Sequence, residues 1–151
     1  MNIEYIIGLN IGNHDSSAAL LKNGELIAFA EQERISRNKL SIGEPPVDAL
    51  KYCLRREGIT LRNVTAIAIG MDWKYRNNHY GMPQEELDKY TIFENVDWFL
   101  PEVEFGTYRP KIYPVMHHIA HAASAYRVSG FENSAVLVID NRGEKSSASL
   151  G

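Results

Sequence analysis

The sequence predicts an α/β fold with a mixed sheet, whose elements follow one another in the order β-β-β-α-β-α. Apolar runs of strand length at residues 3–11 and 64–70 are typical of strands that are buried on both faces. Apolar residues at helical spacing, from Val47 to Leu54, indicate an amphipathic helix between these strands. A strand–turn–strand pattern occurs near each end of the chain, which indicates that a second unit begins in the last residues.

The first three strands are expected to pair antiparallel. Residues 3–11 form the first strand, and residues 16–22 and 25–31 form the next two. The last two strands flank Asn23-Gly24, which is the strongest short sequence signal for a β-hairpin because both residues tolerate a positive φ.

The polar segment at residues 32–39 is predicted to be a loop, and the helix after it is predicted to end at Gly58. The buried strand at residues 64–70 follows. These elements complete the first half of the predicted lobe.

Residues 71–110 differ from the rest of the chain, because they are polar and rich in aromatic residues and prolines, with weak periodicity. We interpret them as an insertion with one or two short helices around residues 84–99. Their aromatic side chains could line a substrate-binding pocket, form a small satellite core or make a homodimer contact. A short strand at 112–115, a helix at 117–128 and a strand at 135–140 are expected to follow.

An internal repeat relates the two strand–turn–strand segments. Residues Ile7–Leu20 align without gaps with Leu137–Leu150, so that Ser-Ser-Ala-x-Leu falls on itself and Asn10 falls on Asp140. Self-similarity at an offset of 130 positions suggests a duplicated unit rather than a short-period repeat. The predicted organisation is a first lobe over residues 1–134, which includes the insertion, and the truncated opening of a second lobe over residues 135–151.

The two turns of this repeat suit the binding of a nucleotide as two facing loops. Backbone N–H groups in tight glycine turns form anion-binding concavities, and small serine side chains let a phosphate approach. The alternative is two ordinary hairpin turns in which Ser and Asn satisfy nearby backbone groups. The nucleotide-binding candidates are Asn10, Gly12, Asn13, Asp15, Ser16, Arg142 and Gly143.

Three residues are candidate metal ligands. His117 and His121 are four residues apart, so they lie on one face of a helix, and Asp140 ends an apolar strand. Two imidazoles and one carboxylate suit zinc, iron or a similar metal, and three protein ligands leave coordination positions open for chemistry. The alternative is that the histidines are merely buried and paired. His118 faces another side of the helix, where packing or a hydrogen bond is expected.

Composition narrows the class of protein. A chain of 151 residues with 44% hydrophobic content can bury a core, and one domain is the default. A formal net charge of −3 without basic clusters argues against nucleic acid or an anionic membrane as the main partner. The first residues have no positive region followed by an apolar core, and no run is long enough to cross a bilayer, so a cytoplasmic location is expected.

Three motifs carry a resemblance to a known family: Asn10–Leu20, Glu31–Lys39 and His117–Ala125. They resemble the signatures of the O-carbamoyltransferases, which include enzymes of nodulation-factor and antibiotic biosynthesis. These proteins contain a Kae1-like domain of the actin/hexokinase/Hsp70 superfamily, so the resemblance implies a ribonuclease H-like (actin-like ATPase) lobe. It also implies a reaction in which carbamoyl phosphate and ATP form carbamoyl-adenylate, which then carbamoylates an alcohol.

The resemblance also implies roles for individual residues. His117, His121 and Asp140 match the family's N-terminal metal ligands, with iron as the expected metal and zinc as a chemically reasonable one. His14 and Lys39 match positions near the nucleotide and the transferred group. His14 would deprotonate the acceptor hydroxyl and Lys39 would supply a point charge. The structural alternatives are that His14 caps its turn and that Lys39 is a solvated charge.

Two residues depart from the family pattern, and the chain is shorter than the family. The superfamily usually has Asp where Asn10 stands, although the carbamoyltransferase branch tolerates Asn there. In the family, Gly usually follows directly the residue that corresponds to Asp140, whereas this chain has Asn141. Arg142 in the second turn could therefore help or crowd a phosphate. Family members are several times longer, so we expect a fragment that has no transfer activity on its own.

Two other functions compete with an N-terminal carbamoyltransferase segment. A Kae1-like subunit of tRNA threonylcarbamoylation would share the histidine pair, but the acidic balance of this chain disfavours an RNA-facing surface. A non-catalytic metal- or nucleotide-binding module would bind its ligand and yet remain inactive when the remaining domains are supplied.

Overall fold

The computed structural model of the chain describes residues 3–11, 14–81, 83, 85, 110–141 and 143–151. The chain divides into two compact units, and each is described by itself. Unit 1 comprises Met1–Ile69 and Ile92–Tyr113, and unit 2 comprises Gly70–Thr91 and Pro114–Gly151. No helix within the described part of the chain is long and apolar enough to cross a membrane.

Unit 1 is built on a five-stranded sheet in the order β3-β2-β1-β4-β5. Strand β1 pairs antiparallel with β2, β2 pairs antiparallel with β3, and β1 pairs parallel with β4. The α/β class and the mixed sheet are therefore confirmed, while the actin-like assignment stays a prediction. The strands are β1 (Tyr5–Asn10), β2 (Ser17–Lys22), β3 (Glu25–Glu31), β4 (Ala66–Ile69) and β5 (Lys111–Pro114).

The predicted hairpin between β2 and β3 is confirmed. Asn23 has φ +51° and Gly24 has φ +86°, the left-handed values that a two-residue hairpin turn of this twist requires. The prediction that the strands at residues 3–11 and 64–70 are buried on both faces is wrong, because in β1 and β4 buried side chains alternate with more exposed ones, as in strands with one face against the core. Tyr5, Ile7 and Leu9 supply the buried face of β1.

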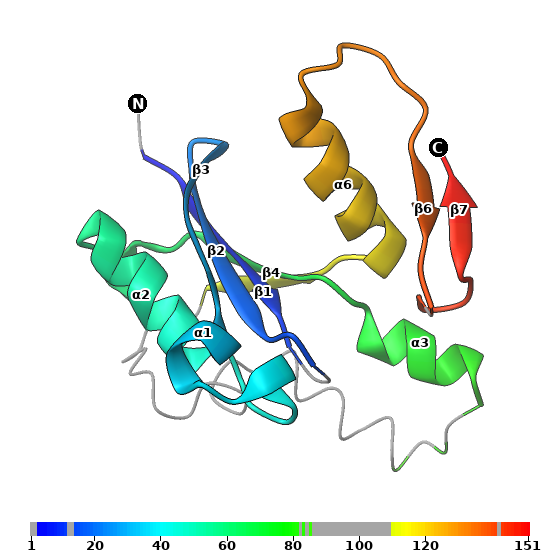
Figure 1. The fold of residues 1–151 in the computed structure, drawn as a ribbon, viewed down its shortest axis with the longest axis horizontal. Coiled ribbons are helices and arrows are strands. Elements are labelled where there is room, and N and C mark those ends of the chain that lie inside the picture. The colour runs from blue at the N-terminus through cyan, green and yellow to red at the C-terminus, as the bar shows by residue number, and fades with distance from the viewer. Residues whose placement is uncertain (1–2, 12–13, 82, 84, 86–109, 142) are drawn as a thin grey trace. The chain divides into compact units, whose positions relative to one another are not determined.

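Helix α2 (Val47–Glu57) covers the sheet of unit 1, as Figure 1 shows. Its apolar stripe includes Leu50 and Cys53, both fully buried, and the helix ends at Gly58 in the left-handed conformation. The predicted helix and its stop are thus confirmed. Two short 3-10 turns complete the unit, η1 (Lys39–Ser41) and η2 (Leu61–Asn63).

The prediction of a loop over residues 32–39 is wrong for its first half, because Gln32–Ser36 form the short helix α1. Arg37 ends this helix with φ +64°, and its N–H group bonds to the Glu33 carbonyl. The buried side chain of Gln32 ties the helix to the rest of unit 1, which is a contact that local polarity does not reveal.

Unit 2 contains α3 (Trp73–His79), α6 (His117–Ser129), β6 (Leu137–Ile139) and β7 (Ala148–Leu150). The predicted histidine-bearing helix and the strand after it are confirmed, and Figure 1 shows α6 beside the β6–β7 ribbon. The helices predicted around residues 84–99 lie outside the described residues. Helix α3 was not predicted; the Asp72 carboxylate caps it by accepting the Tyr75 N–H at 2.8 Å.

The two hairpins of the internal repeat pair in the same register. Each pairing of the second hairpin recurs in the first when both partners are shifted back by 130 positions. Ile7 pairs with Leu20 as Leu137 pairs with Leu150, and Leu9 pairs with Ala18 as Ile139 pairs with Ala148. The pair formed by Asn10 and Ser17 corresponds to the 2.8 Å hydrogen bond from the Asp140 N–H to the Ser147 carbonyl. The shared register supports the repeat, and the duplication of a whole lobe stays a prediction.

Candidate metal and nucleotide site

The three predicted metal ligands converge in unit 2. His117 and His121 lie on one face of α6, and Asp140 directly follows β6. Their ligand atoms all lie within 4.8 Å of one another. The His117 Nε2 atom is 2.7 Å from Asp140 Oδ2 and 3.0 Å from His121 Nε2, and His121 Nε2 is 3.7 Å from the same carboxylate oxygen.

The orientation of the His117 ring is fixed by a backbone contact. Its Nδ1 atom lies 3.0 Å from the Gly70 carbonyl oxygen. A carbonyl oxygen can only accept, so Nδ1 carries the proton in this contact. The other ring nitrogen, Nε2, is thereby turned toward His121 and Asp140, which is the arrangement typical of metal-binding histidines.

The spacing of these atoms fits one ion. Ligand atoms bound to a single first-row metal at roughly 2.1 Å lie about 3.0 to 3.4 Å apart. The observed separations of 2.7, 3.0 and 3.7 Å bracket that range. Two imidazole nitrogens and a carboxylate oxygen are also ligands that iron and zinc both accept.

The surroundings of the Asp140 carboxyl favour its ionised form. Partial burial raises its pKa, but the backbone N–H of Asn141 and the neighbouring His117 and His121 outweigh burial and hold the pKa below its ordinary value. The Asn141 N–H donates to Asp140 Oδ1 at 2.6 Å, which leaves Oδ2 directed at the histidines.

A buried carboxylate that the sequence did not point to lies at the start of α6. Glu144 is only 2% exposed, and its Oε1 atom accepts the backbone N–H of His117 at 2.7 Å and that of Asp72 at 3.0 Å. An acidic residue in the segment after β6 has no local signal for this contact, because both of its partners are distant in sequence.

His118 takes the role that was expected of a residue on another face of the helix. Its Nδ1 atom lies 3.0 Å from Ser149 Oγ, a hydrogen bond to β7. Gly143, a nucleotide-binding candidate, packs against the same ring. A Cβ atom at Gly143 would lie 2.9 Å from both Cδ2 and Nε2 of His118, so this position has room only for glycine.

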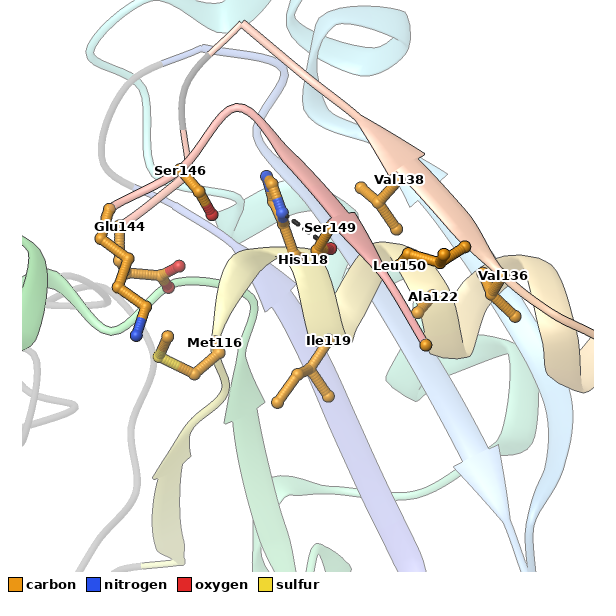
Figure 2. Close-up of a pocket in the computed structure, with 12 residues that line it drawn as sticks. Met116, His118, Ile119, Ala122, Val136, Val138, Glu144, Ser146, Ser149 and Leu150 are labelled. Carbon is orange, nitrogen blue, oxygen red and sulfur yellow. Dashed lines mark hydrogen bonds between the residues drawn. The ribbon is translucent and has the colours of Figure 1, made fainter.

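A pocket of about 330 Å³ lies between α6 and the β6–β7 ribbon. Figure 2 shows Glu144 and Met116 at one end of it and Val136 and Leu150 at the other. The described lining is mainly apolar and does not include the three predicted metal ligands.

The first nucleotide-binding candidate in unit 1, Asn10, closes its own turn. The Asn10 amide donates to the His14 carbonyl at 3.1 Å and to the Asp15 carbonyl at 2.9 Å. Aspartate, which the superfamily usually has here, cannot donate two such bonds. Asp15 adopts φ +54° in this turn. Three further candidates, Gly12, Asn13 and Arg142, lie outside the described residues.

The two predicted catalytic residues are brought to neighbouring segments of unit 1. The Asp15 N–H donates to the Leu40 carbonyl at 2.6 Å, which places His14 beside the turn that contains Lys39. His14 Nδ1 lies 2.7 Å from Asp15 Oδ2, and both side chains are about half exposed. The carboxylate therefore holds one imidazole nitrogen of His14.

Ser16 is placed differently from what the sequence suggested. Its side chain is buried and donates to the Glu44 carbonyl at 2.5 Å, so its hydroxyl holds a neighbouring loop. The Ser16 carbonyl accepts the Gln32 N–H at 2.8 Å. The Gln32 side-chain oxygen in turn accepts the N–H groups of Asp48 and Ala49, each at 3.1 Å. Gln32 therefore links the candidate loop to the start of α2.

The family model described as the carbamoyltransferase N-terminus matches residues 5–151. This chain belongs to that family. The nodulation protein NolNO of Sinorhizobium fredii is 34% identical over 149 residues, which cover 91% of this chain and 21% of the relative. The protein sll1178 of Synechocystis sp., described as uncharacterized, is 30% identical over an alignment of 175 positions that covers 97% of this chain and 27% of the relative.

Among solved structures, YeaZ from Pseudomonas aeruginosa is similar over 92% of this chain and 55% of its own, with a TM-score of 0.48 and 18% identity. The family assignment confirms the resemblance that the three sequence motifs carried. This carbamoyltransferase segment spans only 21% and 27% of the lengths of its two curated relatives.

Proposed function

We propose that this chain is the N-terminal part of an ATP-dependent O-carbamoyltransferase. The parent enzyme would move a carbamoyl group from carbamoyl phosphate, through carbamoyl-adenylate, to an alcohol of a sugar or natural product. The observation that carries the proposal is the convergence of His117, His121 and Asp140 in a chain of the carbamoyltransferase N-terminus family.

In this proposal His117, His121 and Asp140 hold a divalent metal, with iron expected and zinc as the alternative. When bound, such an ion supplies Lewis-acid chemistry that offsets negative charge on phosphate and carbonyl oxygens. The depressed pKa of Asp140 supports this role, because the contacts with the Asn141 N–H and the neighbouring histidines favour the ionised carboxylate.

His14 is proposed to act as the general base in the transfer step. The Asp15 carboxylate at Nδ1 orients the ring, which leaves Nε2 to take a proton. The acceptor oxygen forms its bond to the carbamoyl carbon, the bond from that carbon to the adenylate phosphate oxygen breaks, and AMP leaves. The hydroxyl proton ends on His14 Nε2.

Lys39 and the two turns are proposed to bind the anionic parts of the substrates. An exposed lysine on the turn beside His14 offers a point charge for a phosphate or a polarised carbonyl. Ser16 would contribute through its backbone, since its hydroxyl already binds Glu44. The remaining nucleotide-contact candidates are Asn10, Gly12, Asn13, Asp15, Arg142 and Gly143.

The metal proposal is tested first by elemental analysis of the purified chain. We expect near-stoichiometric iron or zinc, and its loss in the double variant His117→Ala/His121→Ala. His79→Ala is the matched control, because His79 is exposed on α3 and is not part of the triad. Far-UV circular dichroism must show that both variants fold. A folded wild-type protein without metal, or equal metal in the double variant, would contradict the proposal.

The transfer proposal is tested with radiolabelled carbamoyl phosphate, ATP and a panel of alcohols. The chain alone is expected to be inactive, whereas the chain supplied with the remaining length of a relative such as NolNO is expected to transfer the label. Carbamoylation by the chain alone would refute the need for that length. Metal and ATP binding without transfer in the complete protein would favour a non-catalytic binding module.

A further inference from the structure

Helix α6 begins without a capping side chain of its own. Its N-cap residue, Met116, makes no side-chain hydrogen bond to the first turn, and its thioether sulfur is only a weak acceptor. The first N–H groups of a helix need acceptors, and the positive end of the helix dipole favours an anion there. Glu144 meets both needs from the segment between β6 and β7, because its Oε1 atom accepts the His117 N–H at 2.7 Å.

The same oxygen atom of Glu144 binds a second segment. It accepts the Asp72 N–H at 3.0 Å. Asp72 lies two residues beyond Gly70, whose carbonyl oxygen accepts the His117 Nδ1–H at 3.0 Å. One carboxylate oxygen therefore fixes both the backbone of His117 and the segment that orients its ring. Figure 2 shows the Glu144 carboxylate directed toward the first turn of α6.

We propose that Glu144 is a positioning residue for the metal centre, acting through the orientation of the His117 imidazole. Without Glu144, the backbone of His117 and the segment that carries the Gly70 carbonyl are no longer bonded to the same carboxylate oxygen. The His117 ring then loses the fixed orientation that directs Nε2 toward His121 and Asp140. The effect on metal binding rests on the proposed function. The effect on the ring orientation does not, because it depends only on contacts within the protein.

If Glu144 acted only as a helix cap, its variants would rank in a different order. A cap that acts through its charge should be replaced well by Glu144→Asp, which keeps the carboxylate, and poorly by Glu144→Gln. A positioning role that depends on reach gives the opposite order. The glutamine keeps an acceptor oxygen at the same distance along the side chain, whereas the aspartate is one methylene too short to reach both N–H groups.

The experiment measures the His117 Nδ1–H signal by ¹⁵N NMR of metal-free protein labelled at histidine. We expect a protected Nδ1–H in the wild-type protein and in Glu144→Gln, and its loss by exchange in Glu144→Ala and Glu144→Asp. The ring signals of His14, which belongs to unit 1, serve as the internal reference. Lys145→Ala is the matched control, since Lys145 is the exposed neighbour of Glu144 and lines the same pocket.

Metal affinity is the second readout, measured by titration with Zn²⁺ or Fe²⁺. Glu144→Ala should raise the Kd about 10- to 100-fold, the usual effect of removing a group that orients a metal ligand. Lys145→Ala should leave the Kd unchanged.

Either of two results overturns the positioning role. One is an unchanged His117 Nδ1–H signal in Glu144→Ala, and the other is better retention in Glu144→Asp than in Glu144→Gln. If the wild-type protein binds no metal, the proposed function fails, and the Nδ1–H signals still decide the role of Glu144. If Glu144→Ala does not fold, the comparison of Glu144→Gln with Glu144→Asp decides it.

Discussion

Replacing Gln32 by methionine tests the link between the candidate loop of unit 1 and helix α2. Methionine has nearly the same length and volume, so the packing is kept while the hydrogen bonds are removed. The Gln32 side chain is 4% exposed and accepts the N–H groups of Asp48 and Ala49 in the first turn of α2. Pro46, the N-cap residue of that helix, makes no capping bond.

The expected cost follows from what the two N–H groups lose. Ala49 is fully buried, so water cannot replace the lost acceptor, and an unsatisfied buried group costs about 1–3 kcal/mol. The Asp48 N–H lies at a partly exposed residue and recovers some hydration. We therefore expect Gln32→Met to lower the free energy of unfolding by roughly 2–3 kcal/mol, a large share of the 5–15 kcal/mol typical of a domain.

The assay is urea denaturation at 25 °C followed by far-UV circular dichroism, with the slope m compared between variants. Arg34→Met is the matched control on the same helix, because the Arg34 side chain is 72% exposed and its described ion pairs are with carboxylates of its own segment, Glu31 and Glu33. It should cost less than about 1 kcal/mol. Equal losses for the two variants would refute the capping role of Gln32.

Three further outcomes follow from the structure. If the complete protein has the proposed activity, His14→Gln should lower carbamoyl transfer about 10²- to 10⁴-fold while ATP binding is kept, as measured by initial rates and calorimetry. The hydrogen bond from Lys22, more than any other contact, lowers the pKa of the Glu57 carboxyl. The stability that this pair contributes is therefore present above the unfolded-state pKa and is lost as the pH falls through the lower folded-state pKa. Glu57→Gln should flatten that acid-side loss in urea titrations repeated across pH, and an unchanged pH profile would contradict it. Gly143→Ala should destabilise unit 2 by about 1–3 kcal/mol in thermal unfolding, because the new Cβ meets the His118 ring at 2.9 Å, and a neutral effect would show that the ring moves freely.

The parts of the fold that the sequence predicted are those that local chemistry determines. Asn23-Gly24 specifies its turn through two positive φ angles, and Gly58 and Gly130 end their helices in the same way. Helix α1 was missed because its decisive residue, Gln32, is a polar side chain that is buried through partners on α2. Helix α3 was missed although Asp72 offers a local capping signal.

In the candidate site, too, the residues that follow from local sequence pattern were predicted and those set by distant contacts were not. Helical spacing alone placed His117 and His121 on one face, and the apolar strand pointed to Asp140. Glu144 and Gln32 escaped prediction because each caps a helix from a distant segment, and a sequence gives no sign of which helix start lacks a cap until the fold brings the two together. Ser16 was predicted on a local pattern, and its hydroxyl is instead engaged by Glu44.

The shared register of the two hairpins has an evolutionary consequence. Asn10 and Asp140 occupy the same place in the two ribbons, and they differ only in that asparagine has an NH₂ group where aspartate has a carboxylate oxygen. The amide turns inward and closes its own loop, whereas the carboxylate turns outward to two imidazoles. Codons for asparagine and aspartate differ by a single base. A repeated ribbon can therefore pass from building its own turn to holding a ligand in one mutational step, while its strand pairing stays unchanged.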